Sequence, residues 1–157
     1  PRAYAAGDVP WTPINDSLID VDALADIDVE GREVLGPSAF CRLVWQERDS
    51  RREAGKAAFD WIVARNRISH LDTRNSREMT GLLSVLSRRL GFRLQPGFSE
   101  RVVFRGLYFR GLTLFDLDEK NLPHGSRASL QHARGEVDEL LEALEPGEQG
   151  LTAGAEK

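Results

Sequence analysis

Residues 59–66 read Phe-Asp-Trp-Ile-Val-Ala-Arg-Asn, a short apolar run that ends abruptly at charged and polar side chains. An apolar run of this length, from Phe59 to Ala64, is typical of a strand buried on both faces in a parallel sheet. Asn66 stands just beyond it, at the carboxyl end, where open parallel sheets place their ligands. This stretch therefore predicts both a class of fold and the location of a site.

Helical and strand patterns alternate on either side of this stretch. The clearest helix is expected over residues 75–90, between a capping Asn75 and a terminating Gly91. Its apolar side chains recur at helical spacing, at Met79, Leu82, Leu83, Leu86 and Leu90. Further strands are expected over 8–14 and 92–94, further helices over 17–25, 37–56, 99–109 and 130–144, and an acidic, irregular stretch before Gly36. This order predicts a helix-rich α/β fold with a mostly parallel sheet.

The composition is that of a folded globular protein. The 157 residues are about one domain long, with 41% apolar and 29% charged side chains. A single cysteine, Cys41, excludes an internal disulfide and a cysteine-based zinc site within the chain. The net charge of −4 conceals a basic middle, because residues 41–110 hold 15 basic and 7 acidic side chains. Most of the basic residues are arginines, which bind phosphate and carboxylate groups in bidentate geometry.

Three apparent sites lack the residues that their chemistry needs. The acidic residues between Asp20 and Glu30 do not follow the spacing of a calcium-binding loop, which favours a solvated acidic edge. The three histidines have no metal-ligand spacing. Residues 55–57, Gly-Lys-Ala, resemble the end of a phosphate loop, but Ser50 replaces its first glycine and Ala57 its magnesium-binding hydroxyl residue.

Asn66 and the arginines around it form the more informative pattern. The Asn66 amide offers one acceptor and two donors, which suits the adenine edge, although many strands also end in Asn to begin a turn. Four arginines cluster around the same loop and the start of the following helix, at Arg65, Arg67, Arg74 and Arg77. They could bind a phosphate-rich polymer or form a solvated charged rim, and both interpretations stay open.

Six short motifs occur in order between residues 12 and 117, within a matching stretch of roughly residues 8–145. They are Thr12–Leu24 (TPINDSLIDVDAL), Asp60–Arg67 (DWIVARNR), Gly91–Arg93 (GFR), Pro96–Phe98 (PGF), Arg101–Arg105 (RVVFR) and Gly111–Leu117 (GLTLFDL). Together they resemble the MipZ-like ATPases, which belong with ParA and MinD to the deviant-Walker P-loop ATPases. The resemblance implies the C-terminal part of a P-loop NTPase, with αβα layers around a mostly parallel sheet.

The phosphate loop and magnesium site of that family lie N-terminal to the matching motifs. Residues 1–146 are therefore expected to be the C-terminal portion of the ATPase domain, followed by a disordered tail over 147–157. We expect this chain alone neither to bind nor to hydrolyse ATP. For the complete protein, the resemblance implies ATP and Mg²⁺ as cofactors and a homodimer formed on ATP binding. It also implies non-specific DNA binding, a ParB-like partner, inhibition of FtsZ assembly, and a cytoplasmic, nucleoid-associated location.

The resemblance also assigns roles to individual residues. Asn66 would contact adenine, Pro96 and Gly97 would close the base pocket, and Asp16 would lie near the nucleotide and the dimer face. Arg74 matches a DNA-contacting arginine of the family. Glu78 stands where the family has another basic residue one turn later, and Arg77 could partly substitute for that residue.

Two alternative functions remain beside this one. The chain could belong to a ParA-like partition ATPase, or it could act without ATP as an arginine-rich module that binds nucleic acid or a partner protein. A membrane role is not expected, because anionic lipid would repel the acidic side chains of the last helix. These are Glu136, Asp138, Glu139, Glu142 and Glu145.

Overall fold

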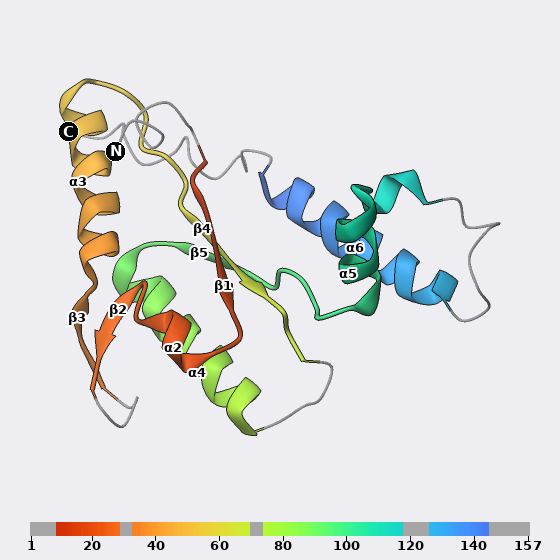
Figure 1. The fold of residues 1–157 in the computed structure, drawn as a ribbon. Coiled ribbons are helices and arrows are strands. Elements are labelled where there is room, and N and C mark those ends of the chain that lie inside the picture. Colours follow the sequence, from red (N-terminus) through yellow and green to blue (C-terminus); the bar gives the residue numbers. More distant parts are fainter. Residues whose placement is uncertain (1–8, 29–32, 70–73, 118–125, 145–157) are drawn as a thin grey trace. The chain divides into compact units, whose positions relative to one another are not determined.

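A computed structural model describes residues 9–28, 33–69, 74–117 and 126–144. The chain divides into two compact units, Pro1–Glu100 and Arg101–Lys157. The first unit carries the strands, and the described part of the second is helical (Figure 1). The tail over 147–157, which was expected to be disordered, lies outside the described residues, and the prediction of one ATPase domain over 1–146 stays a prediction.

The main sheet of the first unit has three parallel strands. They are β1 (Trp11–Asn15), β4 (Ile62–Asn66) and β5 (Arg93–Gln95), in the order β1-β4-β5. Strands β1 and β4 pair from Trp11↔Ile62 to Asn15↔Asn66, so their carboxyl ends are level. The predicted α/β fold with a parallel sheet is confirmed. The strand predicted over 59–64 is instead found over Ile62–Asn66, and Arg65 near its end pairs with the Asp16 carboxylate.

The core of the first unit is built around Trp61. This side chain is fully buried and packs edge to face against Phe40 and Phe92, with ring centroids 6.2 Å and 5.3 Å away. Its indole N–H donates to the Thr12 hydroxyl over 3.0 Å, which joins β1 to the residue that precedes β4. The aromatic cluster thus fixes the central strands, since packed rings and a satisfied indole resist displacement.

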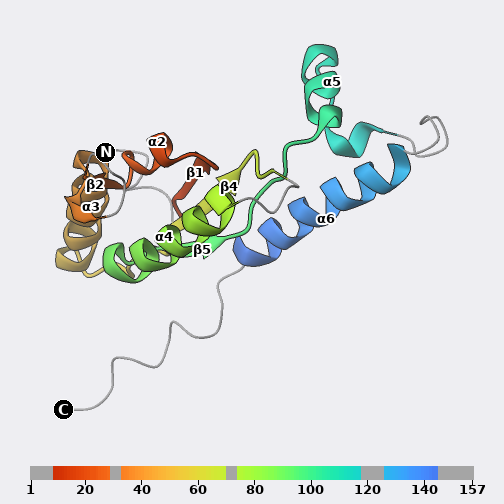
Figure 2. The ribbon, with the colours of Figure 1, turned by 90° about the horizontal axis from the view of Figure 1, so that it is seen from below.

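Two helices cover the core of this unit. Helix α3 (Ala39–Glu53) begins after Ser38, whose hydroxyl accepts the Cys41 N–H, so the prediction that Pro37 lies in its first turn is wrong. Helix α4 (Arg74–Leu90) contacts β5 (Figure 2). Asn75 lies inside α4 and does not cap it. The apolar stripe predicted for this helix faces the core, with Met79, Leu83, Leu86 and Leu90 buried.

The region between β1 and α3 differs from the prediction. Instead of a helix over 17–25 and an irregular stretch, it forms a single helical turn, α2 (Leu18–Val21), and an antiparallel pair, β2 (Ala25–Ile27) with β3 (Val34–Pro37). The helix ends at Val21, and the residues that follow it, Ala23 and Leu24, bond to Ser38 instead of continuing the helix. The Ser38 hydroxyl donates to the Ala23 carbonyl over 2.7 Å, and the Ser38 N–H donates to Leu24.

In the second unit, two helices and a 3-10 turn enclose a small core. They are α5 (Val102–Arg110), η1 (Leu114–Asp116) and α6 (Ser126–Leu144). The buried side chains are Leu107, Leu114, Leu130 and Ala133. An ion pair of 2.8 Å between Arg101 and Glu136, 11% and 16% exposed, joins the start of α5 to α6. In the described part of the chain, no helix has the length and apolar character needed to cross a membrane.

Candidate functional site

The carboxyl edge of the main sheet brings together the nucleotide-site residues predicted from the sequence. The ends of β1 and β4 are level, and the Asp16 N–H donates to the Asn66 carbonyl over 3.0 Å. Strand β5 ends beside Ala64, so Pro96 and Gly97 follow at the same edge. One small region therefore holds residues from three separate parts of the sequence, namely Asp16, Asn66 and the adjacent Pro96 and Gly97.

Asn66 is half-buried at the end of β4, and its side chain lies next to β1. Its amide donates to the Asn15 side-chain oxygen over 3.3 Å, which uses one of two donor hydrogens. The next residue, Arg67, has a φ of 55°, a left-handed conformation that is uncommon for residues other than glycine. Such a backbone at a strand end is typical of positions where a site fixes the direction of the chain.

Gly97 makes the closest approach in this region. It has a φ of 78°, and a β-carbon at this position would lie 1.7 Å from the Arg65 carbonyl oxygen. The following N–H, of Phe98, donates to that same carbonyl over 2.9 Å. Only glycine allows this packing of the Pro96–Gly97 turn against the end of β4, because any side chain would overlap the backbone.

The Arg65 guanidinium forms a buried ion pair with Asp16. The Nη2 and Nε atoms of Arg65 lie 2.5 Å and 3.1 Å from the Asp16 Oδ1, and the two side chains are 11% and 8% exposed. The sequence grouped Arg65 with the arginines around one loop and helix start, and did not indicate this pair. The available signal was positional: each residue stands at the carboxyl end of a predicted parallel strand, where neighbouring strands bring such residues together.

The loop that carries Asp16 is held by its own polar side chains. The Asp20 carboxylate accepts the Asn15 N–H over 2.9 Å, and the Ser17 hydroxyl accepts the Ile19 N–H over 3.3 Å. These bonds close a tight turn directly after β1. Among the described residues, no group of three or more histidine, cysteine or acidic side chains is placed to hold a metal ion.

The two arginines predicted to contact DNA lie near the start of α4. Both are exposed. Arg74 pairs with Glu78 one turn later, with 2.7 Å between its Nε and the carboxylate, and this hydrogen bond raises the pKa of Arg74. Glu78 thus neutralises one of the charges that would attract phosphate. Of the same cluster, Arg67 pairs with Glu100 over 3.2 Å.

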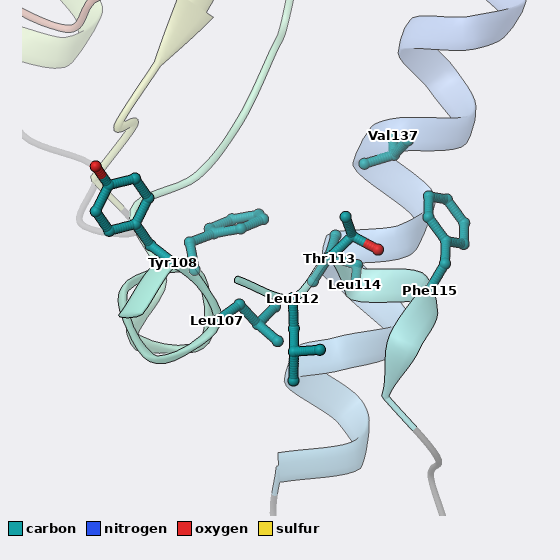
Figure 3. A pocket seen from close by; sticks show the side chains of 8 residues that line it. Leu107, Tyr108, Leu112, Thr113, Leu114, Phe115 and Val137 are labelled. Carbon is teal, nitrogen blue, oxygen red and sulfur yellow. The ribbon is translucent and has the colours of Figure 1, made fainter. Parts of the chain in front are cut away.

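A separate pocket of about 330 Å³ lies in the second unit (Figure 3). Leu107 and Leu112 line one part of it, and Phe115 and Val137 line another. The hydroxyl of Thr113, which also lines the pocket, already donates to the Asp116 carboxylate over 2.7 Å. The lining is therefore almost entirely apolar, without the converging polar groups that orient a small-molecule ligand.

Comparison with known proteins identifies one family. The family model described as ATPase MipZ matches residues 2–147, which is nearly the whole chain. No curated protein matches the chain.

Proposed function

Because this chain belongs to the MipZ ATPase family, we propose that it is part of an ATPase that positions the division plane. In this proposal, ATP binding brings two subunits together, and the dimer binds DNA without sequence preference and inhibits FtsZ assembly. A ParB-like protein is the proposed recruiting partner. The family match carries the proposal, and the convergence of Asp16, Asn66 and the Pro96–Gly97 turn supports it.

The carboxyl edge of the sheet supplies the proposed base pocket. Asn66 has an acceptor oxygen and a second donor hydrogen, which match the paired acceptor and donor of adenine. The Pro96–Gly97 turn would form a wall beside it, held by the Phe98–Arg65 hydrogen bond. ATP with Mg²⁺ would supply the reaction that returns the dimer to monomers, while these residues orient the base.

The triphosphate would require a different element. Residues 1–157 contain no Gly-x-x-x-x-Gly-Lys-Ser/Thr sequence, whose backbone N–H groups cradle phosphates. We therefore expect the 157-residue chain by itself not to hydrolyse ATP. We propose that hydrolysis belongs to the complete gene product.

Helix α4 supplies the proposed DNA contacts. Arg74 and Arg77 lie on its first turn, exposed, and three residues apart they share a side of the helix. Arginines placed in this way contact phosphates and add affinity independently of sequence. The Arg74–Glu78 ion pair implies weaker binding than an uncompensated pair of arginines would give.

The test uses the full-length gene product. Fluorescence anisotropy with a labelled 30-base-pair duplex should show tighter binding with a non-hydrolysable ATP analogue than with ADP. The ATP-bound protein should also lower the light scattering of assembling FtsZ. Asn66→Ala should weaken binding of a fluorescent ATP analogue, whereas Gln46→Ala, an exposed amide on α3, should not. Nucleotide-dependent DNA binding without any effect on FtsZ would favour a ParA-like partition role instead.

A further inference from the structure

The Arg65 side chain joins the proposed nucleotide edge to helix α4. On one side it holds the Asp16 carboxylate through Nε and Nη2. On the other side its Nη1 donates to the Thr80 hydroxyl over 2.9 Å, and its Nη2 lies 3.4 Å from the Ser76 hydroxyl. Ser76 and Thr80 belong to the first two turns of α4, the same turns that carry Arg74 and Arg77.

The main chain of Arg65 contributes to the same edge. Its carbonyl accepts the Phe98 N–H, and Gly97 packs directly against it. One residue therefore contacts three segments: the loop after β1 through Asp16, the turn after β5 through Gly97 and Phe98, and α4 through two hydroxyls. The ion pair is buried, so solvent and salt weaken it less than they weaken a surface pair.

The shape of the guanidinium allows these contacts to be made together. Its donors point in fixed directions in one plane, so that Nε and Nη2 engage the carboxylate while Nη1 points to Thr80. Lysine carries the same charge on a flexible stem with a single nitrogen. It could pair with Asp16 or reach Thr80, but it could not hold both in this geometry.

We propose that Arg65 is a positioning residue that couples nucleotide binding at the Asp16–Asn66 edge to the DNA-binding orientation of α4. The inference rests on the proposed function, in which dimerisation links ATP to DNA binding, and adds to it a second link within each subunit. A nucleotide that favours one position of the Asp16 loop also favours one position of Ser76 and Thr80, because the guanidinium bonds to both. Coupling between two sites requires such an element in contact with each of them.

The experiment measures coupling separately from binding. In the full-length gene product, the coupling ratio is the DNA dissociation constant without nucleotide divided by that with a non-hydrolysable ATP analogue. Arg65→Lys should lower this ratio by roughly tenfold. The dissociation constant of Arg65→Lys for a fluorescent ATP analogue should stay within about threefold of the unmodified protein's, because Arg65 does not itself contact the nucleotide in this proposal. Arg52→Gln, which breaks an exposed ion pair with Asp49 within α3, is the control and should leave the ratio unchanged.

A second pair of variants leaves the buried ion pair intact. Thr80→Val removes the hydroxyl that accepts from Arg65, whereas Thr80→Ser keeps it. Thr80 is exposed, so both variants should fold. The inference predicts a reduced coupling ratio for Thr80→Val and an unchanged ratio for Thr80→Ser.

The outcomes separate this inference from the proposed function. If the unmodified protein binds DNA in a nucleotide-dependent way, and Arg65→Lys and Thr80→Val both keep its coupling ratio, the coupling role of Arg65 is refuted and the proposed function stands. A loss of analogue binding in Arg65→Lys that accounts for the whole loss of coupling would also refute it. If the unmodified protein shows no nucleotide dependence, the proposed function itself fails.

Discussion

Gly97 lies against the main chain of Arg65, and a β-carbon on Gly97 would be 1.7 Å from the Arg65 carbonyl oxygen. Main-chain atoms cannot move aside as the end of a flexible side chain can. The turn after β5 and the end of β4 therefore keep this separation only with glycine at position 97. The Phe98 N–H donates to the same Arg65 carbonyl, so this hydrogen bond forms only when Gly97 packs closely against the end of β4.

Gly97→Ala should therefore destabilise the first unit strongly. The variant adds left-handed backbone strain and forces β5 away from β4, which we expect to lower the free energy of unfolding by at least about 2 kcal/mol. Urea denaturation measures this difference. Gly55→Ala is the control, since Gly55 has a φ of 69° with nothing within 4 Å of an added β-carbon, and it should lose only about 1 kcal/mol. Equal losses in the two variants would contradict the role given to the contact.

Asp16→Ala should destabilise the fold more than loss of a surface acid does. It leaves the Arg65 guanidinium buried without its carboxylate, a change that costs about 3–5 kcal/mol in other proteins. Asp60→Ala removes the partner of Arg93 from a pair that is 38% and 49% exposed, and should cost less than about 1 kcal/mol. Urea denaturation of both variants measures this difference in the free energy of unfolding, from the shift of each midpoint at an unchanged slope of the free energy against urea concentration. A loss in Asp16→Ala no larger than in Asp60→Ala would be inconsistent with a buried pair.

DNA binding should respond in opposite directions to changes at Arg74 and Glu78. In the full-length gene product, Arg74→Ala should weaken binding evenly across sequences and reduce the slope of log K against log salt by about one phosphate contact. Glu78→Gln should strengthen binding and steepen that slope, because it frees Arg74 from its ion pair. If the unmodified protein, Arg74→Ala and Glu78→Gln all show the same salt slope, the Arg74–Glu78 pair does not lie in the DNA-binding surface.

Cys41 should be unreactive while the protein is folded. Burial raises the pKa of its thiol from the ordinary value of 9.0 to about 11, so the reactive thiolate is scarce at pH 8. Iodoacetamide should modify the thiol rapidly in urea and slowly in its absence. Because the folded pKa is the higher one, the thiol's contribution to stability is complete below pH 9 and is lost as the pH rises through 11. Cys41→Ser should lack that alkaline decline, and fast labelling of folded protein would disprove the burial.

The sequence predicts the parts of the fold that have strong periodicity or a long apolar run. Helix α4 and strand β4 meet those conditions, and both are found within a few residues of the expected positions. The β2–β3 pair was missed because strands of three and four residues, one ending at Pro37, are too short to show alternation. Hydrogen bonds from Ser38, distant in sequence, end the preceding helix, and no local pattern contains that information.

The sequence predicted the place of the candidate site in the fold but not the contacts within it. The position of Asn66 followed from the rule that ligands lie beyond the carboxyl ends of parallel strands. The Arg65–Asp16 pair, 49 residues apart, was not predicted, because it depends on the register that sets Asn15 opposite Asn66. From the sequence alone, a charged residue at a strand end is expected to face solvent. Only the pairing of the strands brings its distant partner next to it. The nucleotide and DNA roles of the site residues stay predictions.

The buried indole of Trp61 gives the molecule an optical reporter at the centre of the sheet. Enclosed by Phe40 and Phe92, it is shielded from water and from dissolved iodide, whereas Trp11 is 40% exposed. Its emission should lie toward the blue and resist quenching while the strands remain packed. A red shift of its emission would then mark loosening of the packing around Trp61, where the indole bonds to Thr12 of β1.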